Sequence, residues 1–129
     1  MQYPPETDFR ERAFRFTCDI FDFCEELAQS PGMARRVAYQ LFDAVSSIGA
    51  NLEEAKAAYS PRDFASTNSI SLKEARESKY WLRLAEAKSL GDKERRRRLL
   101  KESDEWVAML TTGVKNLQTN PGPRTSSLS

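Results

Sequence analysis

Apolar residues repeated at alternating steps of four and three constrain the fold of this chain more than any other feature. In residues 8–29 the repeat consists of Phe9, Ala13, Phe16, Ile20, Phe23 and Leu27. Steps of four and three keep returning to one side of an α-helix, so this spacing predicts a helix with a single apolar stripe. We predict three further helices at residues 31–58, 61–89 and 92–118.

Helix-starting and helix-stopping residues separate these four segments. Ser30-Pro31 and Ser60-Pro61 each offer a Ser as N-cap followed by Pro at the first helical position. The connections are short, so consecutive helices should lie antiparallel, and 129 residues suit one domain. We therefore predict an all-α, antiparallel up-down-up-down four-helix bundle over residues 1–119, followed by a disordered tail at 120–129.

Residues 61–89 carry small and polar side chains where the other segments carry apolar ones. The stripe consists of Asn68, Ser71, Ala75, Ser78, Leu82 and Ala85, with Glu74 and Glu77 next to it. A buried polar group without a hydrogen-bond partner costs about 1–3 kcal/mol. We predict a structural polar network that fixes the helix register, formed by Asn51, Glu54, Asn68, Glu74 and Glu77. A ligand or catalytic site is the alternative interpretation of these residues.

The chain contains no His, which removes the commonest general base and the Glu-x-x-His pairs of di-iron bundles. It also lacks a Gly-rich phosphate loop. A carboxylate-only site for a hard cation is the one metal site left open. We expect no catalytic residues, no metal and no cofactor, and therefore a protein that is not an enzyme.

Two cysteines and the absence of long apolar runs bear on location. Cys18 and Cys24 are six residues apart on one predicted helix, too far apart and wrongly aimed for a mutual disulfide, so we expect buried thiols in a reducing compartment. No apolar run approaches the roughly 20 residues of a membrane span, and no signal-peptide pattern opens the chain. We expect a cytoplasmic protein with no membrane partner.

The first predicted helix carries more aromatic residues than one stripe can hold. Phe14 and Phe21 lie roughly 100° around the helix from the stripe that contains Phe16 and Phe23. They could broaden the buried stripe within a monomer. We favour the other interpretation, in which Phe14 and Phe21 form an interface between identical subunits.

Basic residues crowd the start of the fourth predicted helix. They are Lys93, Arg95, Arg96, Arg97, Arg98 and Lys101, six bases against the single acid Glu94, a local net charge of +5. The chain as a whole has a net charge of only +1. The run could bind nucleic-acid phosphates, contact the acidic first helix of a neighbouring subunit, or simply form a solvated helix start.

Two internal motifs resemble a known family. Ser47, Ile48, Asn51 and Glu54 match a Ser-Ile-Pro-x-Asn-Ile-Ala-Glu-Gly motif, from which Gly49, Leu52, Glu53 and Ala55 depart. Ser60, Asp63 and Phe64 match the start of the third helix, and Lys73, Glu74, Ala75, Glu77, Ser78, Tyr80, Trp81 and Leu82 match a run within it. Over about residues 9–118 the chain is similar to the four-helix bundle proteins encoded by intervening sequences in bacterial large-subunit ribosomal RNA genes.

This resemblance implies an antiparallel bundle that assembles as a homopentameric ring with a basic surface facing nucleic acid. A related branch serves as the accessory protein of diversity-generating retroelements, where the ring engages reverse transcriptase and RNA. Our leading hypothesis is a non-enzymatic homo-oligomer that binds RNA or DNA through residues 93–101. The alternative is a scaffold that recruits a protein partner, such as a reverse transcriptase, and uses the basic run for subunit contact.

Overall fold

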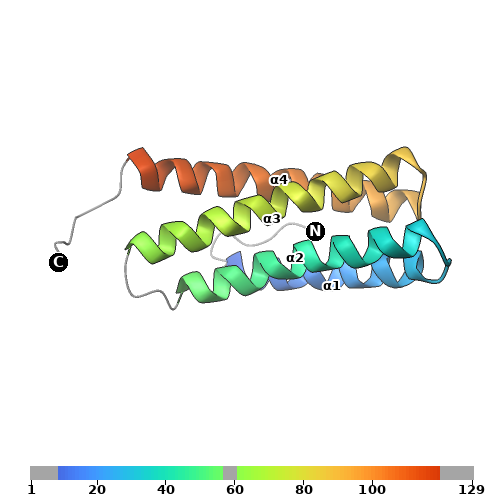
Figure 1. Cartoon of the computed structure of the whole chain (residues 1–129). Coiled ribbons are helices and arrows are strands. Elements are labelled where there is room, and N and C mark those ends of the chain that lie inside the picture. Colours follow the sequence, from blue (N-terminus) through green and yellow to red (C-terminus); the bar gives the residue numbers. More distant parts are fainter. Residues whose placement is uncertain (1–8, 57–60, 120–129) are drawn as a thin grey trace.

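The computed structural model describes residues 9–56 and 61–119, which form four helices lying lengthwise side by side (Figure 1). They are α1 (Phe9–Ala28), α2 (Met33–Lys56), α3 (Pro61–Ala87) and α4 (Lys93–Thr119). Consecutive helices run in opposite directions, which confirms the predicted antiparallel four-helix bundle. The predicted tail at 120–129 lies outside the described residues.

The helix starts follow local sequence signals with one exception. α3 begins at Pro61, and α4 begins directly after Asp92, whose Oδ2 accepts a hydrogen bond from the backbone N–H of Arg95 at 2.8 Å. α2, however, begins at Met33 and not at Pro31. Gly32 has a positive φ of 105°, which is not helical, so the helix can begin only after it, at Met33.

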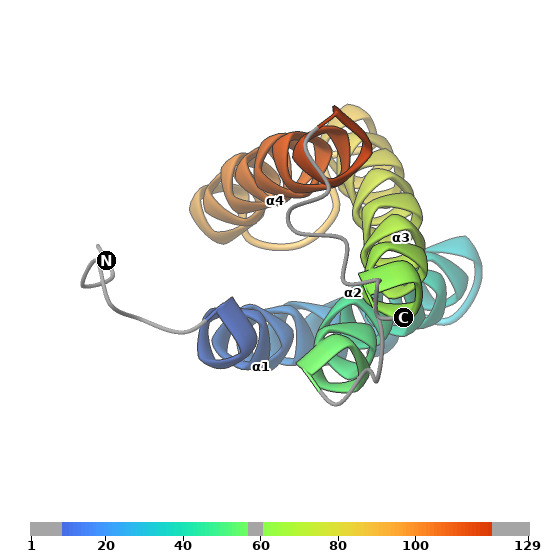
Figure 2. The same cartoon turned by 90° about the vertical axis from the view of Figure 1, so that its left-hand side faces the viewer.

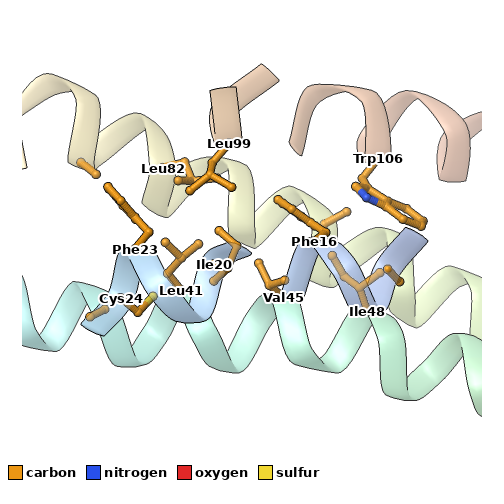
Figure 3. Packing of buried hydrophobic residues seen from close by; sticks show 14 of the residues in the cluster. Phe16, Ile20, Phe23, Cys24, Leu41, Val45, Ile48, Leu82, Leu99 and Trp106 are labelled. Carbon is orange, nitrogen blue, oxygen red and sulfur yellow. The ribbon is translucent and has the colours of Figure 1, made fainter. Parts of the chain in front are cut away.

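Large apolar side chains from all four helices fill the centre of the bundle (Figure 3). The largest fully buried ones include Trp106, Phe16, Phe23, Ile20 and Leu41. The four-three stripe predicted for the first helix is buried from Ala13 to Leu27, while Phe9 at its beginning is exposed. Packing of one stripe per helix is therefore the main stabilising interaction of the fold.

The small and polar stripe of α3 is buried throughout: Asn68, Ser71, Ala75, Ser78, Leu82 and Ala85. Two of its hydroxyls find backbone acceptors. Ser78 donates to the carbonyl of Glu74 at 2.8 Å, and Ser71 reaches the carbonyl of Ile48 on α2 at 3.5 Å. Small side chains let neighbouring helices approach α3 closely, and backbone acceptors remove the cost of burying the hydroxyls.

The helices do not contact one another equally. The end view shows α2 and α3 between α1 and α4 along the chain's path around the bundle (Figure 2). The contact between α1 and α4 is much smaller than the three contacts between consecutive helices. In the described part of the chain, none of the helices combines the length and the apolar character needed to cross a bilayer.

Candidate interaction surfaces

Arg96, in the middle of the basic run, is buried against the α3–α4 turn. Only 4% of the residue is exposed. Its Nε donates to Oε1 of Glu86 at 2.6 Å, and its Nη1 donates to the carbonyls of Leu90 and Gly91 at 2.7 and 3.1 Å. The guanidinium therefore joins the end of α3 to the start of α4, and it is not available to an external ligand.

Two neighbours of Arg96 also pair within the chain. Arg97 donates to the other oxygen of Glu86 at 3.1 Å, and Arg95 lies 3.8 Å from a carboxylate oxygen of Glu26 on α1. Hydrogen bonds from Arg96 and Arg97 hold the pKa of Glu86 below its usual range. Half of the six predicted cations thus contribute to contacts inside the molecule.

The other three predicted cations, Lys93, Arg98 and Lys101, are exposed. Within the described ranges, none of these three forms an ion pair. The run predicted as one binding segment therefore divides into a structural part and an accessible part.

A second set of exposed cations lies on α3, on the side opposite its buried stripe. Lys73, Arg76, Tyr80 and Arg83 follow steps of three and four and are all exposed. No acid interrupts this exposed stripe, and none of its three cations has an ion-pair partner within residues 9–56 and 61–119. Our reading of the sequence missed this stripe, although its four-three spacing opposite the small residues could have revealed it.

The α3 stripe and the accessible cations of α4 lie on adjacent helices. Lys79 of α3 pairs with Asp104 of α4 at 3.0 Å, and Glu86 of α3 pairs with Arg97 of α4 along the seam between the two helices. We call the exposed cations of these two adjacent helices, Lys73, Arg76, Arg83, Lys93, Arg98 and Lys101, the α3–α4 basic surface. Arg98 and Lys101 lie on the side of α4 that faces α1.

Phe14 and Phe21 do not enter the core. They are 64% and 50% exposed, and the ring of Phe21 contacts that of Phe42 on α2 edge-on, with centroids 5.9 Å apart. Cys18, between them on the same helix, is also exposed, contrary to the expectation that both thiols are buried. Cys24 is buried, which raises the pKa of its thiol to about 12. The structure thus leaves an apolar strip on the outside of α1.

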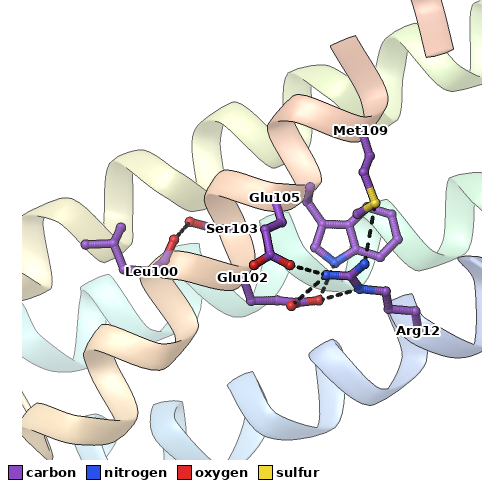
Figure 4. A network of polar contacts seen from close by, with 7 residues as sticks. Arg12, Leu100, Glu102, Ser103, Glu105 and Met109 are labelled. Atoms are coloured by element: carbon purple, nitrogen blue, oxygen red, sulfur yellow. Dashed lines mark hydrogen bonds and ion pairs between the residues drawn. The ribbon is translucent and has the colours of Figure 1, made fainter. Parts of the chain in front are cut away.

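A polar cluster centred on Arg12 joins α1 to α4 (Figure 4). Arg12 donates from Nε and Nη2 to the two oxygens of Glu102, both at 2.9 Å, and from Nη2 to Glu105 at 2.6 Å. Its guanidinium carbon lies 5.7 Å from the ring centre of Trp106, whose Nε1 donates to Glu102 at 3.0 Å. These carboxylates, chiefly Glu102, raise the pKa of Arg12.

Beside this cluster an open groove of about 1060 Å³ runs between α1 and α4. Phe14 and Asp19 line it from α1, and Arg98 and Lys101 line it from α4. The groove thus joins the apolar strip of α1 to the accessible half of the basic run.

The five residues predicted to form one polar network are dispersed. Glu54 is exposed, and the amide of Asn51 donates to the carbonyl of Ser47 on its own helix at 2.8 Å. Glu77 accepts from the indole of Trp81 at 3.4 Å, and Asn68 is buried in the α3 stripe. The hydrogen bonds of the described chain do not join any two of these five residues to each other.

Glu74 of α3 faces α2, where nearby Ser47 acts to lower the pKa of its carboxyl. Desolvation and the nearby carboxylate of Glu77 nevertheless raise the pKa of Glu74. In the part of the chain that the structure describes, no three His, Cys, Asp or Glu residues are placed to hold a metal ion.

Residues 6–112 match the family model described as 23S rRNA-intervening sequence protein. The chain belongs to this family. The match spans α1, α2, α3 and about the first three-quarters of α4, so both the α3 stripe and the basic run lie within the family's domain.

A solved structure is also similar to this chain. A protein of unknown function from the S23 ribosomal protein family of Bacteroides thetaiotaomicron VPI-5482 is 27% identical and superposes with a TM-score of 0.74. The similarity covers 84% of this chain and 99% of that protein. No curated protein sequence matches the chain.

Proposed function

We propose that this protein is a non-enzymatic homo-oligomeric bundle, with a pentameric ring as the expected assembly, that binds RNA or DNA through the α3–α4 basic surface. The main observation in support is that two adjacent helices expose six cations. None of these six cations forms an ion pair within the described ranges. Cations without partners on the protein can neutralise phosphates without first breaking an existing pair.

Two further features support a nucleic-acid ligand. Tyr80 is 59% exposed between Arg76 and Arg83 and contacts the ring of Trp81 edge-on, and an exposed aromatic ring among cations can stack on an unpaired base. Assembly into a ring would repeat the surface in every subunit, so that several weak contacts act on one strand. A net charge of only +1 per chain then matters less than the local arrangement of cations.

Two charge-matched double variants test this proposal. Arg76→Ser/Arg83→Ser removes two cations without partners, whereas Arg95→Ser/Arg97→Ser removes two that already contact Glu26 and Glu86. Binding of mixed-sequence RNA and DNA is measured by fluorescence anisotropy between 50 and 200 mM salt, concentrations at which phosphate contacts change affinity by about tenfold or more.

We expect the first variant to lose roughly tenfold in affinity at low salt and to flatten the salt dependence by about 1.5 logarithmic units per decade. The second variant should change affinity less than about threefold, because its cations are already paired. Undetectable binding by the native protein at low salt, or equal losses in both variants, would contradict the proposal.

A second candidate is the protein-recruiting scaffold, with the basic run used between subunits. The position of Arg98 and Lys101 in the α1–α4 groove favours it, because Phe14 and Asp19 form the opposite wall. Under this hypothesis, Arg98→Ser/Lys101→Ser weakens self-association while leaving RNA binding unchanged. Light scattering and anisotropy on the same variant therefore separate the two candidates.

A further inference from the structure

Two unpartnered apolar surfaces with opposite charge lie on different sides of this bundle. The first, which we call the α1 face, consists of the exposed residues Phe14, Cys18 and Phe21. Acids flank it, with Asp22 and Glu25 both exposed. From Phe16 to Ala28, α1 carries four acids and no base. Beside Phe14, the exposed Arg15 pairs with Glu11 at 3.1 Å. The α1 face is therefore aromatic at its centre and negative at its Phe21 end.

The second surface is a groove of about 730 Å³ between the first half of α2 and the last part of α3, which we call the α2–α3 groove. Its apolar lining includes Met33, Val37, Trp81 and Leu84, and Met33 is 74% exposed. Its charged lining residues are Arg36 and Lys88, and no acid lines it. The groove is therefore apolar at its centre and positive at its edge.

We propose that the α1 face of one copy docks in the α2–α3 groove of the next copy. This inference rests on the proposed homo-oligomer and names the surfaces that build it. The Phe side chains supply apolar knobs for an apolar groove, and the carboxylates beside them meet Arg36 and Lys88. Docking buries both exposed apolar surfaces in one contact.

Charge decides between this arrangement and a symmetric one. If two α1 faces met each other, Asp22 and Glu25 of one copy would approach the same carboxylates of the other, and like charges at an interface are unfavourable. Two α2–α3 grooves facing each other would likewise bring their cations together. Face against groove pairs unlike charges.

Such a head-to-tail contact uses different surfaces on the two partners, so every copy has one of each left to extend the assembly. Both surfaces border α2, on its two sides: Phe21 contacts Phe42 of α2, and Val37 of the same helix lines the groove. A head-to-tail contact gives a ring where the rotation between successive copies closes, and an open filament where it does not.

Complementation between two defective variants tests the inference. Phe14→Ser/Phe21→Ser removes the aromatic side chains of the α1 face, and Met33→Glu/Lys88→Glu places negative charge in the α2–α3 groove. All four substituted residues are exposed, so both variants should keep the native fold. Each variant alone should be monomeric at a concentration where the native protein is oligomeric. An equimolar mixture should form a 1:1 heterodimer, because it retains one intact groove and one intact face. Lys73→Glu/Arg76→Ser, on the outer side of α3, changes the net charge by the same amount and is the matched control, which should assemble like the native protein.

Cys18 provides a second readout, since it lies in the α1 face and is unchanged in the groove variant. Its alkylation should be at least tenfold slower in the native assembly than in Met33→Glu/Lys88→Glu, while the buried Cys24 stays protected wherever the bundle is folded. A mixture that remains monomeric, or a groove variant that assembles normally, overturns this inference alone. A native protein that is monomeric throughout overturns the homo-oligomer itself.

Discussion

The start of α4 and the outer side of α3 are both basic, but they use their charges differently. At the start of α4, Arg96 is buried and bound to Glu86 and to two backbone carbonyls. On α3, Arg76 and Arg83 are exposed and form no ion pair within the described ranges. Only half of the denser cluster in the sequence is thus available in the structure.

This difference teaches that the density of charge in a sequence does not measure its availability to a ligand. A guanidinium bound to a carboxylate and to carbonyls contributes to stability and adds little to the external potential. Substitutions should therefore separate: those of the buried Arg96 should affect folding, and those of the α3 stripe should affect binding.

The largest expected effect is at Arg96. Arg96→Ala leaves Glu86 with one fewer partner and the carbonyls of Leu90 and Gly91 without their side-chain donor, so we expect a loss of about 2–4 kcal/mol in the free energy of unfolding. Urea denaturation followed by circular dichroism measures it. Arg96→Met keeps the apolar stem and removes only the guanidinium, so it isolates the loss of the hydrogen bonds. Arg98→Ala, at an exposed position, should stay within about 0.5 kcal/mol of the native protein. Equal stability of the Arg96 and Arg98 variants would remove the contrast.

A smaller loss is expected at Gly91, in the turn that Arg96 holds. Its φ is +66°, and an added Cβ would lie 2.7 Å from side-chain carbons of both Phe23 and Leu27. Gly91→Ala should cost about 1–3 kcal/mol, from the backbone conformation and the overpacking together. Gly32→Ala is the control, because Gly32 has φ +105° but no atom within 4 Å of its added Cβ. Thermal unfolding of the two variants separates the cost of the clash with Phe23 and Leu27 from the cost of the backbone conformation. An equal loss of stability in both variants would show that the clash contributes nothing.

The smallest effect is the pH dependence of the Arg96 contact. Because its arginine partners lower the pKa of Glu86, the folded state gains stability from this carboxylate above the ordinary Glu value of about 4.3. That gain disappears as pH falls through 4.3 towards the lower folded pKa. The stability difference between the native protein and Arg96→Met, measured by urea titration from pH 7 to pH 3, should shrink below about pH 4. A difference that grew with acidity would contradict this assignment.

Most of the fold follows from local patterns. The apolar stripe of α1 and the small stripe of α3 specify which side of each helix is buried, and the Pro61 start is read directly from the sequence. The start of α2 was misplaced because Pro31 is followed by a glycine with positive φ. A Ser-Pro pair can precede a turn as readily as a helix, and the sequence does not show which conformation that glycine adopts.

The interaction surfaces were less predictable. Four consecutive arginines surround a helix, so which one turns inward depends on how α4 crosses α3, a tertiary property. The polar network was wrongly expected to link Asn51, Glu54 and Glu77, since Asn51 and Glu77 found acceptors or donors on their own helices and Glu54 faces outward. The α3 stripe, in contrast, needed only the helical period and was overlooked because its cations are spread along the helix.

The polar cluster in which Arg12 of α1 contacts Glu102 and Glu105 of α4 also bears on the order of folding. Arg12 and Glu102 are 90 residues apart in the chain, whereas the other three helix contacts join neighbours in sequence. Closing a longer loop costs more entropy, and contacts between distant residues are rewarded only once that loop is closed. The three hairpins of consecutive helices can form early. We expect α1 and α4 to meet last, when Arg12 pairs with Glu102 after most of the apolar core has packed.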